Sequence, residues 1–337
     1  MPASITESFA ELGRRAAQRL TAIDPLLPDS VDLPADPPPI SGDPSDGCGT
    51  VFTACGDDGV VTAIGQCAHW AGEPGSMSLT WSCARQFLLN PVLAGPDPAG
   101  ALDDLISQWR DHLAKVSEAE EDDTAAVIRW ASRDVEGVRV LQRHGLMPHT
   151  VIGARVAVKD DHRPGPTGAG AVSAGIRVRR AGPADLDVAT ALGLALVRYE
   201  ANFGSVHERP WTAEALRTDV ATQLAAPEPW VWIAERDGEP IGLLGAEPPA
   251  AAAWIAPRVR LDPVAYLGEM FVRPAERGGG AAALLIEQFN AAASAAGVAV
   301  TLLHYGQVNP LSGPFWSRQG YRPLWTTWAA MPARTLR

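Results

Sequence analysis

A glycine-rich turn between an expected strand and an expected helix is the segment of this sequence best suited to chemistry. It reads Tyr266-Leu-Gly-Glu-Met-Phe-Val-Arg-Pro-Ala-Glu-Arg-Gly-Gly-Gly-Ala-Ala-Ala-Leu-Leu, with the strand ending at Arg273-Pro274 and the helix beginning within 277–282. The first N–H groups of a helix have no partner inside the helix and carry a partial positive charge. Residues without bulky side chains let a phosphate oxygen reach these donors. The turn therefore predicts an anion-binding site, with a tight loop that binds nothing as the alternative.

Two other phosphate-binding motifs are absent around this turn. No Gly-Lys-Ser or Gly-Lys-Thr follows the glycines, as a Walker A loop requires, and no G-x-G-x-x-G closes a first strand. Both nucleotide-binding interpretations are weakened by these absences.

Composition limits the kinds of partner that the chain can take. Its 337 residues suggest about two domains, and 46% hydrophobic with 20% charged residues is typical of a folded protein. The net charge of −11 excludes a general attraction for nucleic acid or an anionic membrane, so an anionic ligand must be held by a local site. The sequence shows neither a secretion signal nor a run of about 18 apolar residues. We therefore expect a cytoplasmic protein that contacts no membrane and no nucleic acid.

A polar stretch rich in Pro, Gly and Ala divides the chain, as an exposed linker would. We predict an N-terminal helix followed by a Pro-rich segment over 1–47, a first domain over 48–158, the linker over 159–175 and a second domain over 176–337.

The pattern of apolar residues predicts a mixed α/β fold in both halves. In the first half we expect strands at 49–54, 59–66, 76–82, 124–131 and 149–158, and helices at 7–20, 101–116 and 135–144. In the second half we expect strands at 176–180, 230–235, 241–247, 266–272, 298–305 and 321–331, with helices at 183–200, 212–224, about 281–296 and 310–319. Asp237-Gly238 between two of these strands is a strong hairpin signal.

Two motifs make residues 176–331 resemble the GNAT N-acetyltransferase superfamily. Arg277, Gly280 and Ala282 match its Q/R-x-x-G-x-G/A loop after Val272-Arg273-Pro274. The downstream segments Asn309-Pro-Leu-Ser and Phe315-Trp-Ser-Arg-Gln-Gly-Tyr match a family helix start and the aromatic that precedes Gly-Phe or Gly-Tyr. The first half repeats the order of elements, so the resemblance implies a tandem of two GNAT-like domains with a degenerate N-terminal copy and a catalytic C-terminal copy.

The resemblance implies acetyl-CoA as cofactor and acyl donor. Its pyrophosphate would lie on the main-chain N–H groups of the turn, with Arg273 and Arg277 near its charge, and its pantetheine would lie along the preceding strand. Family positions close to the cofactor also include Asn309 and Trp316. The cofactor-binding residues implied in this way are Met270, Phe271, Val272, Arg277, Gly278, Gly279, Gly280, Ala281, Ala282, Asn309 and Trp316.

Acyl transfer to an amine favours a general base, because an alkylamine is almost entirely protonated at neutral pH. Glu269 is the expected catalytic base, and a strand carboxylate facing solvent or an arginine is the alternative for this residue. The resemblance implies that acceptor residues come from the first two helices and their connection; the candidates there are Tyr199, Glu200, His207 and Glu208. Many relatives have a Tyr at the position of Trp316, where its hydroxyl protonates the departing thiolate. Tyr305, Ser312 or a water could take the place of that hydroxyl.

The first half lacks signs of a cofactor site. No small-residue turn follows the expected strand at 76–82, and we infer that this half serves packing or enclosure of substrate. Cys67 and His69 with Cys83 or Cys55 suggest zinc, but their irregular spacing and apolar surroundings favour buried thiols. We expect no metal.

These observations favour an N-acetyltransferase that acts on the amine of a small molecule by direct attack. An enzyme that acetylates proteins or peptides, and a non-catalytic CoA-binding sensor or scaffold, are the two alternatives. The acceptor, the length of the acyl chain and a homodimeric state are left open.

Overall fold

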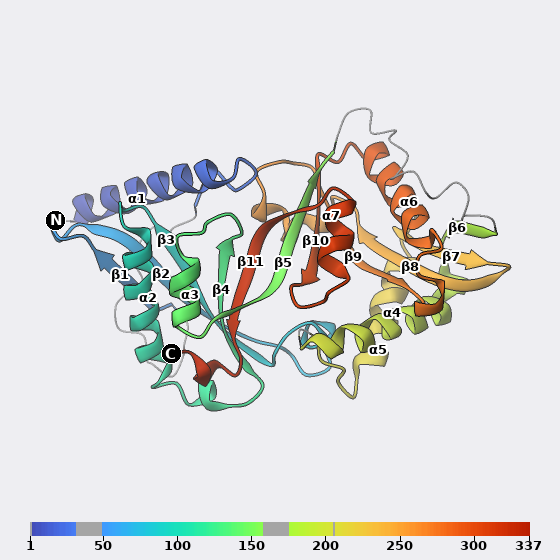
Figure 1. Cartoon of the computed structure of the whole chain (residues 1–337), viewed down its shortest axis with the longest axis horizontal. Coiled ribbons are helices and arrows are strands. Elements are labelled where there is room, and N and C mark those ends of the chain that lie inside the picture. Colours follow the sequence, from blue (N-terminus) through green and yellow to red (C-terminus); the bar gives the residue numbers. More distant parts are fainter. Residues whose placement is uncertain (1, 32–48, 158–174, 205) are drawn as a thin grey trace.

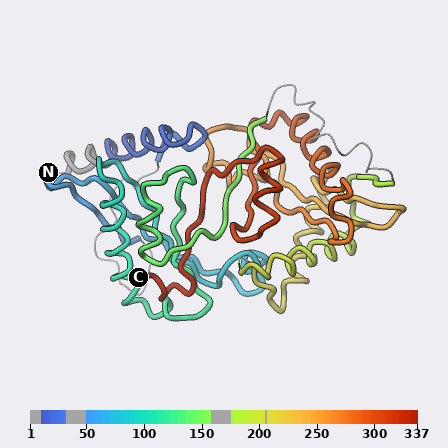
Figure 2. The backbone as a smooth tube through the Cα atoms, viewed as in Figure 1, coloured from blue at the N-terminus to red at the C-terminus, as the bar shows by residue number. Residues whose placement is uncertain are grey.

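The computed structural model describes residues 2–31, 49–157, 175–204 and 206–337. Most of the Pro-rich segment and nearly all of the predicted linker lie outside these residues. The described strands form one eleven-stranded sheet in the order β1-β2-β3-β4-β11-β5-β10-β9-β8-β7-β6 (Figures 1 and 2). None of the helices in the described ranges is both long enough and apolar enough to cross a membrane.

The order of the elements along the chain bears out the mixed α/β prediction. The first half contains α1 (Pro2–Ile23), β1 (Val51–Cys55), β2 (Val61–Ala71), β3 (Arg85–Leu93), α2 (Pro98–Leu113), β4 (Thr124–Ala131), α3 (Val138–Arg143) and β5 (Met147–Val156). The second half contains β6 (Ile176–Arg180), α4 (Leu186–Glu200), α5 (Thr212–Leu224), β7 (Val231–Arg236), β8 (Glu239–Glu247), β9 (Val264–Val272), α6 (Ala281–Ala295), β10 (Val300–Gly306), α7 (Ser312–Arg318) and β11 (Arg322–Ala330).

The two halves repeat one arrangement and exchange their last strands. In the first half β1, β2 and β3 pair antiparallel and β3 pairs parallel with β4; β7, β8, β9 and β10 repeat this pattern in the second half. The strand β11 then pairs with β4, and β5 pairs with β10. At the centre β5 and β11 lie side by side (Figure 1). The sheet is therefore continuous across the predicted domain boundary.

Helices cover both faces of this sheet because side chains alternate along each strand. Phe87 and Leu89 of β3 pack with Trp109 of α2, whereas Val92 packs on the opposite face with Leu12 of α1. The second half is arranged in the same way: α6 covers one face and α4 with α5 the other (Figure 1).

One expected strand of the first half is misplaced. Residues 76–82 form a loop with a single 3-10 turn, Met77–Thr80, and the strand is β3. Alternating polar and apolar residues in the loop imitate a strand, and Pro91 within β3 argues against one. Pro91 is tolerated because it lies beyond Leu89, where the pairing of β3 with β4 has ended. In the second half Asp237 and Gly238 both have positive φ, 52° and 86°, as a tight hairpin turn requires.

Candidate active site

The parallel strands β9 and β10 separate part-way along their length. They pair from Val264–Val300 to Leu267–Leu303, after which β9 continues to Val272 and β10 to Gly306. The pairing of β9 with β8 is shifted at Gly268, because Gly245 lies opposite Glu269 and Ala246 lies opposite Leu267. Such a bulge bends a strand and increases its twist. The main chain of β9 beyond Gly268 is thus left without a partner on the side of β10.

The N-terminus of α6 lies directly after this open strand. Gly280 precedes the helix with φ 93°, and Gly278 has φ 81°, a conformation that glycine adopts without strain. No side chain caps the helix and its first turn contains no acidic residue. Glu276, just before the turn, is paired with Arg236 at 2.8 Å. The first N–H groups of α6 are therefore free of a competing carboxylate.

The corresponding helix of the first half, α2, has a different N-terminus. The absence of a small-residue turn was inferred after 76–82, but the strand is β3, which ends at Leu93 and is followed by Ala94-Gly95. However, Asp97 caps α2 by accepting a hydrogen bond from the Gly100 N–H at 2.9 Å, and proline occupies the first position of the helix. A carboxylate of the protein thus already occupies the place of an anionic ligand.

A cavity of about 720 Å³ adjoins the open part of β9 and is lined by both halves. Glu269 and Met270 of β9 border it from the second half, with Trp316 of α7. Trp81 and Arg129 border it from the first half. Its volume falls within the usual range for small-molecule sites.

The carboxylate of Glu269 is enclosed between two glycines. A Cβ at Gly245 would lie 2.9 Å from Glu269 Oε1, and a Cβ at Gly193 would lie 3.3 Å from Oε2. Burial, and then the charge of Asp219, raise the pKa of Glu269 from 4.5 to about 7. A carboxyl group with such a pKa is available both to accept and to release a proton near neutral pH.

Comparison with known proteins agrees with this geometry. Residues 227–323 match the family model described as an acetyltransferase (GNAT) domain, and this range includes the separated strands, the glycine turn and α7. The second half of the chain contains a GNAT domain. No curated protein sequence matches the chain.

Solved structures that resemble the chain include two that cover more than 80% of it. A GCN5-related N-acetyltransferase from Sphaerobacter thermophilus is 15% identical with a TM-score of 0.51, over 84% of this chain and 80% of that chain. This likeness shows that the GNAT fold extends over most of the chain. A tandem GNAT protein from the clavulanic acid biosynthesis pathway is 15% identical with a TM-score of 0.41, over 81% of this chain and 80% of that chain. An aminoglycoside N-acetyltransferase in complex with CoA is 20% identical with a TM-score of 0.37, over 44% of this chain and 89% of that chain.

The side chains of the expected pantetheine-binding strand are mostly packed in the GNAT domain. Phe271 belongs to the core beneath α4 and α5, and Val272 belongs to the core beneath α6. Met270 is partly buried and borders the cavity. Any contact of Phe271 and Val272 with a cofactor would accordingly use the main chain.

Arg277 is folded back on the GNAT domain. Its Nε donates to the carbonyl oxygen of Val272 at 3.1 Å, and its guanidinium lies 4.5 Å from the centre of the Tyr199 ring. Tyr199 therefore supports Arg277 and does not border the cavity. The guanidinium thus lies at the end of β9, next to the glycine turn.

Asn309 connects α7 to α4. Its Nδ2 donates to Glu200 Oε1 at 2.7 Å, while its Oδ1 accepts from the Leu311 and Ser312 N–H groups at 3.0 and 3.4 Å. Asn309 is 3% exposed, and burial raises the pKa of Glu200, which borders the cavity. These contacts make Asn309 a positioning residue for the start of α7 and for Glu200.

The remaining expected residues divide between the cavity and the surface. His207 borders the cavity, and burial lowers its pKa, which favours the neutral imidazole. Glu208 is exposed, pairs with Arg198 at 2.9 Å and does not border the cavity. Trp316 is buried against Phe315 and Tyr321. The candidates for proton donation, Tyr305 and Ser312, both border the cavity.

A polar and aromatic wall of the cavity was missed from the sequence. Tyr266 and His304, on β9 and β10, are hydrogen-bonded through the hydroxyl and Nδ1 at 3.0 Å. Trp254 stacks on His304 and donates from Nε1 to Glu247 Oε2 at 2.7 Å. Burial, and then the charges of nearby arginines, lower the pKa of His304 to about 4. A histidine and a tyrosine on neighbouring, otherwise apolar strands were the available signal.

The alternative zinc grouping of cysteines with His69, which their spacing disfavoured, is not found among the described residues. Cys55 is exposed, whereas Cys67 and Cys83 are buried thiols. Cys83 instead lies with Asp123 and His207, all within 4.8 Å of one another. Both oxygens of Asp123 already accept from Arg209, at 2.6 and 3.1 Å, and burial raises the pKa of Cys83 to about 11. The arrangement is that of a partly buried ion pair beside a protonated thiol.

Replacing Asp219 by Asn is expected to lower the pKa of Glu269. The charge of Asp219 is the second cause of the raised value, after burial, so its removal should return the pKa only part of the way from about 7 to 4.5. The acid limb of kcat/KM for acetyl transfer, which reports on the free enzyme, should move to lower pH by that amount. An acid limb that stays in place in D219N would contradict the assignment of this limb to Glu269.

Proposed function

We propose that the protein is an acetyl-CoA-dependent N-acetyltransferase that acts on the amine of a small molecule by direct attack. The observation that carries this proposal is the separation of β9 from β10, with the uncapped N-terminus of α6 at its opening and Glu269 beside it. GNAT domains bind acetyl-CoA or CoA, and no other helix start described above combines glycines, free donors and an open strand.

In this proposal the turn holds the pyrophosphate of acetyl-CoA. The main-chain N–H groups from Gly278 to Ala282 would donate to it, favoured by the dipole of α6. The pantetheine arm would lie along the open side of β9 as an added strand. A main-chain N–H at Met270 or Phe271 would then polarise the thioester carbonyl.

Glu269 would accept the proton of the acceptor amine, directly or through a water. An alkylamine with a pKa near 10.4 is neutral in only about one molecule in 10³ at neutral pH, so a base with a pKa near 7 increases the reactive form at the site. The nitrogen lone pair attacks the thioester carbon, the carbon–sulfur bond breaks, CoA leaves as the thiolate, and the proton that the new amide nitrogen loses balances the charge of this thiolate. Burial raises the pKa of Tyr305, so its hydroxyl stays protonated and is available to the thiolate.

The shape of the cavity favours a small acceptor over a peptide. The first half contributes a wall that includes Trp81, His149 and Cys83, opposite β9. A peptide needs a groove that is open at both ends, and a wall contributed by the first half supports a small acceptor instead. We assign to the first half the role of enclosing the acceptor, and the Asp97 cap on α2 supports a first half without its own cofactor.

A thiol-release assay with acetyl-CoA and a panel of small amines tests the proposal. We expect CoA release with at least one class of amine, and tighter binding of acetyl-CoA than of acetate by calorimetry. Peptide acceptors that outperform every small amine would favour the protein-acetylating alternative. Acetyl-CoA binding without release would favour a sensor, and no binding at all would contradict both.

A further inference from the structure

Arg129 is a partly buried cation at the far wall of the cavity, and it has no partner among the residues that the structure describes. It lies on β4, where it alternates with Ala125 and Val127 on the same face of the strand, and all three residues border the cavity. Its Nε is buried and makes no hydrogen bond, and no carboxylate of the described residues acts on its guanidinium. A buried donor that makes no hydrogen bond is costly, and the guanidinium borders the cavity, so a partner that is supplied from outside the protein is the natural explanation.

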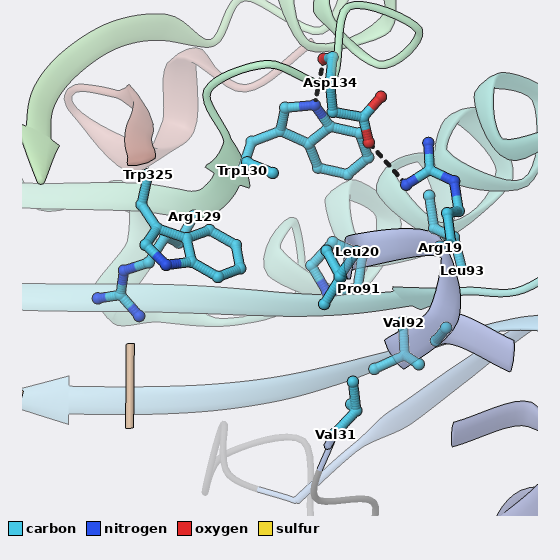
Figure 3. A pocket seen from close by; sticks show the side chains of 12 residues that line it. Arg19, Leu20, Val31, Pro91, Val92, Leu93, Arg129, Trp130, Asp134 and Trp325 are labelled. Carbon is cyan, nitrogen blue, oxygen red and sulfur yellow. Dashed lines mark hydrogen bonds and ion pairs between the residues drawn. The ribbon is translucent and has the colours of Figure 1, made fainter. Parts of the chain in front are cut away.

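The nearby carboxylate is already used by another arginine. Asp134 pairs with Arg19 at 2.6 Å, and its carbonyl oxygen accepts from Trp130 Nε1 at 2.7 Å. Figure 3 shows this pair at one end of a small pocket of about 70 Å³, with the Arg129 guanidinium beside Trp325 and directed away from Leu20 and Val31. Nothing in this pocket therefore neutralises Arg129.

The surroundings of Arg129 add positive charge. Burial, and then repulsion from Arg258, lower the pKa of Arg129 to about 10, so it is still a cation at neutral pH. Burial also lowers the pKa of Arg258, and both arginines act on His304 in the cavity wall. This side of the cavity is suited to an anion.

The opposite end of the cavity is acidic. Glu269, Asp219 and Glu247 border it on the side of β9, α5 and β8. Four strand spacings separate β4 from β9 in the sheet, which is roughly 19 Å between the main chains before either side chain extends. One cavity thus offers a base for an amine at one end and a cation at the other.

We propose that the acceptor carries a carboxylate besides its amine, and that Arg129 binds this carboxylate while the amine lies at Glu269. The inference rests on the proposed function and specifies its acceptor as an extended amino acid with terminal amine and carboxylate groups. Arg129 is then a specificity residue that the first half contributes to a reaction of the second half. Its planar guanidinium suits two parallel hydrogen bonds to a carboxylate.

The test compares ω-amino acids of increasing chain length with alkylamines of equal length that lack the carboxylate. With acetyl-CoA and the full chain, kcat/KM should be about 10- to 100-fold higher for the best amino acid than for its matched alkylamine. Arg129→Met should lower the value for the amino acid to that of the alkylamine. Arg110→Met, an exposed arginine of α2 paired with Asp111, is the matched control and should keep the preference.

The outcomes separate this inference from the proposed function. Equal rates for both series, or a preference that R129M keeps, overturn the carboxylate assignment alone. No CoA release with either series overturns the proposed function. Thermal unfolding then still tests Arg129: the best-fitting amino acid should raise the unfolding temperature of the wild type and of R110M but not of R129M. If R129M does not fold, inhibition of the wild type provides the test. Competitive inhibition by alkyl carboxylates but not by the matched alcohols supports the carboxylate assignment, and equal inhibition by both overturns it.

Discussion

Glu269→Gln is expected to lower kcat/KM for acetyl transfer by about 10²- to 10⁴-fold, the usual contribution of a general base. Gln keeps the shape of the side chain between Gly193 and Gly245 but accepts no proton. Acetyl-CoA binding should be retained, because the turn before α6 is unchanged. Steady-state thiol release and calorimetry measure the two quantities, and Glu287→Gln, at an exposed position of α6, is the matched control.

The dependence on pH makes the same prediction sharper. In the wild type kcat/KM should rise with pH through about 7, and the residual activity of E269Q should lack this limb.

The pH dependence of thermal unfolding shows whether E269Q is folded. The raised pKa means that the contribution of Glu269 to stability is fully present below 4.5 and is lost as the pH rises through about 7, at a cost of roughly 3 kcal/mol. E269Q should therefore unfold at a higher temperature than the wild type at pH 8; wild-type activity in E269Q would refute the role of the residue.

Gly280→Glu is expected to weaken acetyl-CoA binding by about 100-fold or more, through the loss of charged hydrogen bonds to the pyrophosphate. Gly280 has φ 93°, which an L side chain adopts only with strain, and the new carboxylate would compete with the ligand for the N-terminus of α6. The dissociation constant from calorimetry measures the effect.

Gly297→Glu is the control for backbone strain and charge. Gly297 follows the other end of the same helix, also has positive φ at 67°, and has no atom within 4 Å of an added Cβ. The G297E variant should bind acetyl-CoA with the affinity of the wild type. Equal affinities of the Gly280 and Gly297 variants would show that the turn does not hold the cofactor.

The sequence predicted those features that depend on neighbouring residues. The glycine turn, the hairpin at Asp237-Gly238 and the helix over 212–224 follow from local chemistry, and the structure contains each of them. The misplaced strand at 76–82 shows the limit of periodicity, because the true strand β3 contains Pro91 and alternates less clearly. The Asp97 cap was also missed, because the apolar pattern predicted that α2 begins at residue 101, whereas it begins at Pro98.

Long-range pairing accounts for the rest. No local pattern indicates that β5 inserts between β10 and β11. Pairing of β5 within its own half would bury the same apolar residues as the observed pairing with strands of the other half. The cavity that Arg129, Tyr266 and His304 line depends on the observed pairing, which brings strands of different halves to one face. An arginine in an otherwise apolar strand was visible in the sequence, but the cavity that it faces was not.

The exchanged strands also limit how the molecule can move. Rotating one half away from the other would break the ladders of β11 with β4 and of β10 with β5, whose hydrogen bonds cross the centre of the sheet. The two halves therefore cannot open as a hinged clamshell, a motion that is common where two lobes meet at a cleft, while these strands stay paired. A ligand of the cavity would thus enter and leave past side chains and surface loops, while the ladders at the centre of the sheet stay paired.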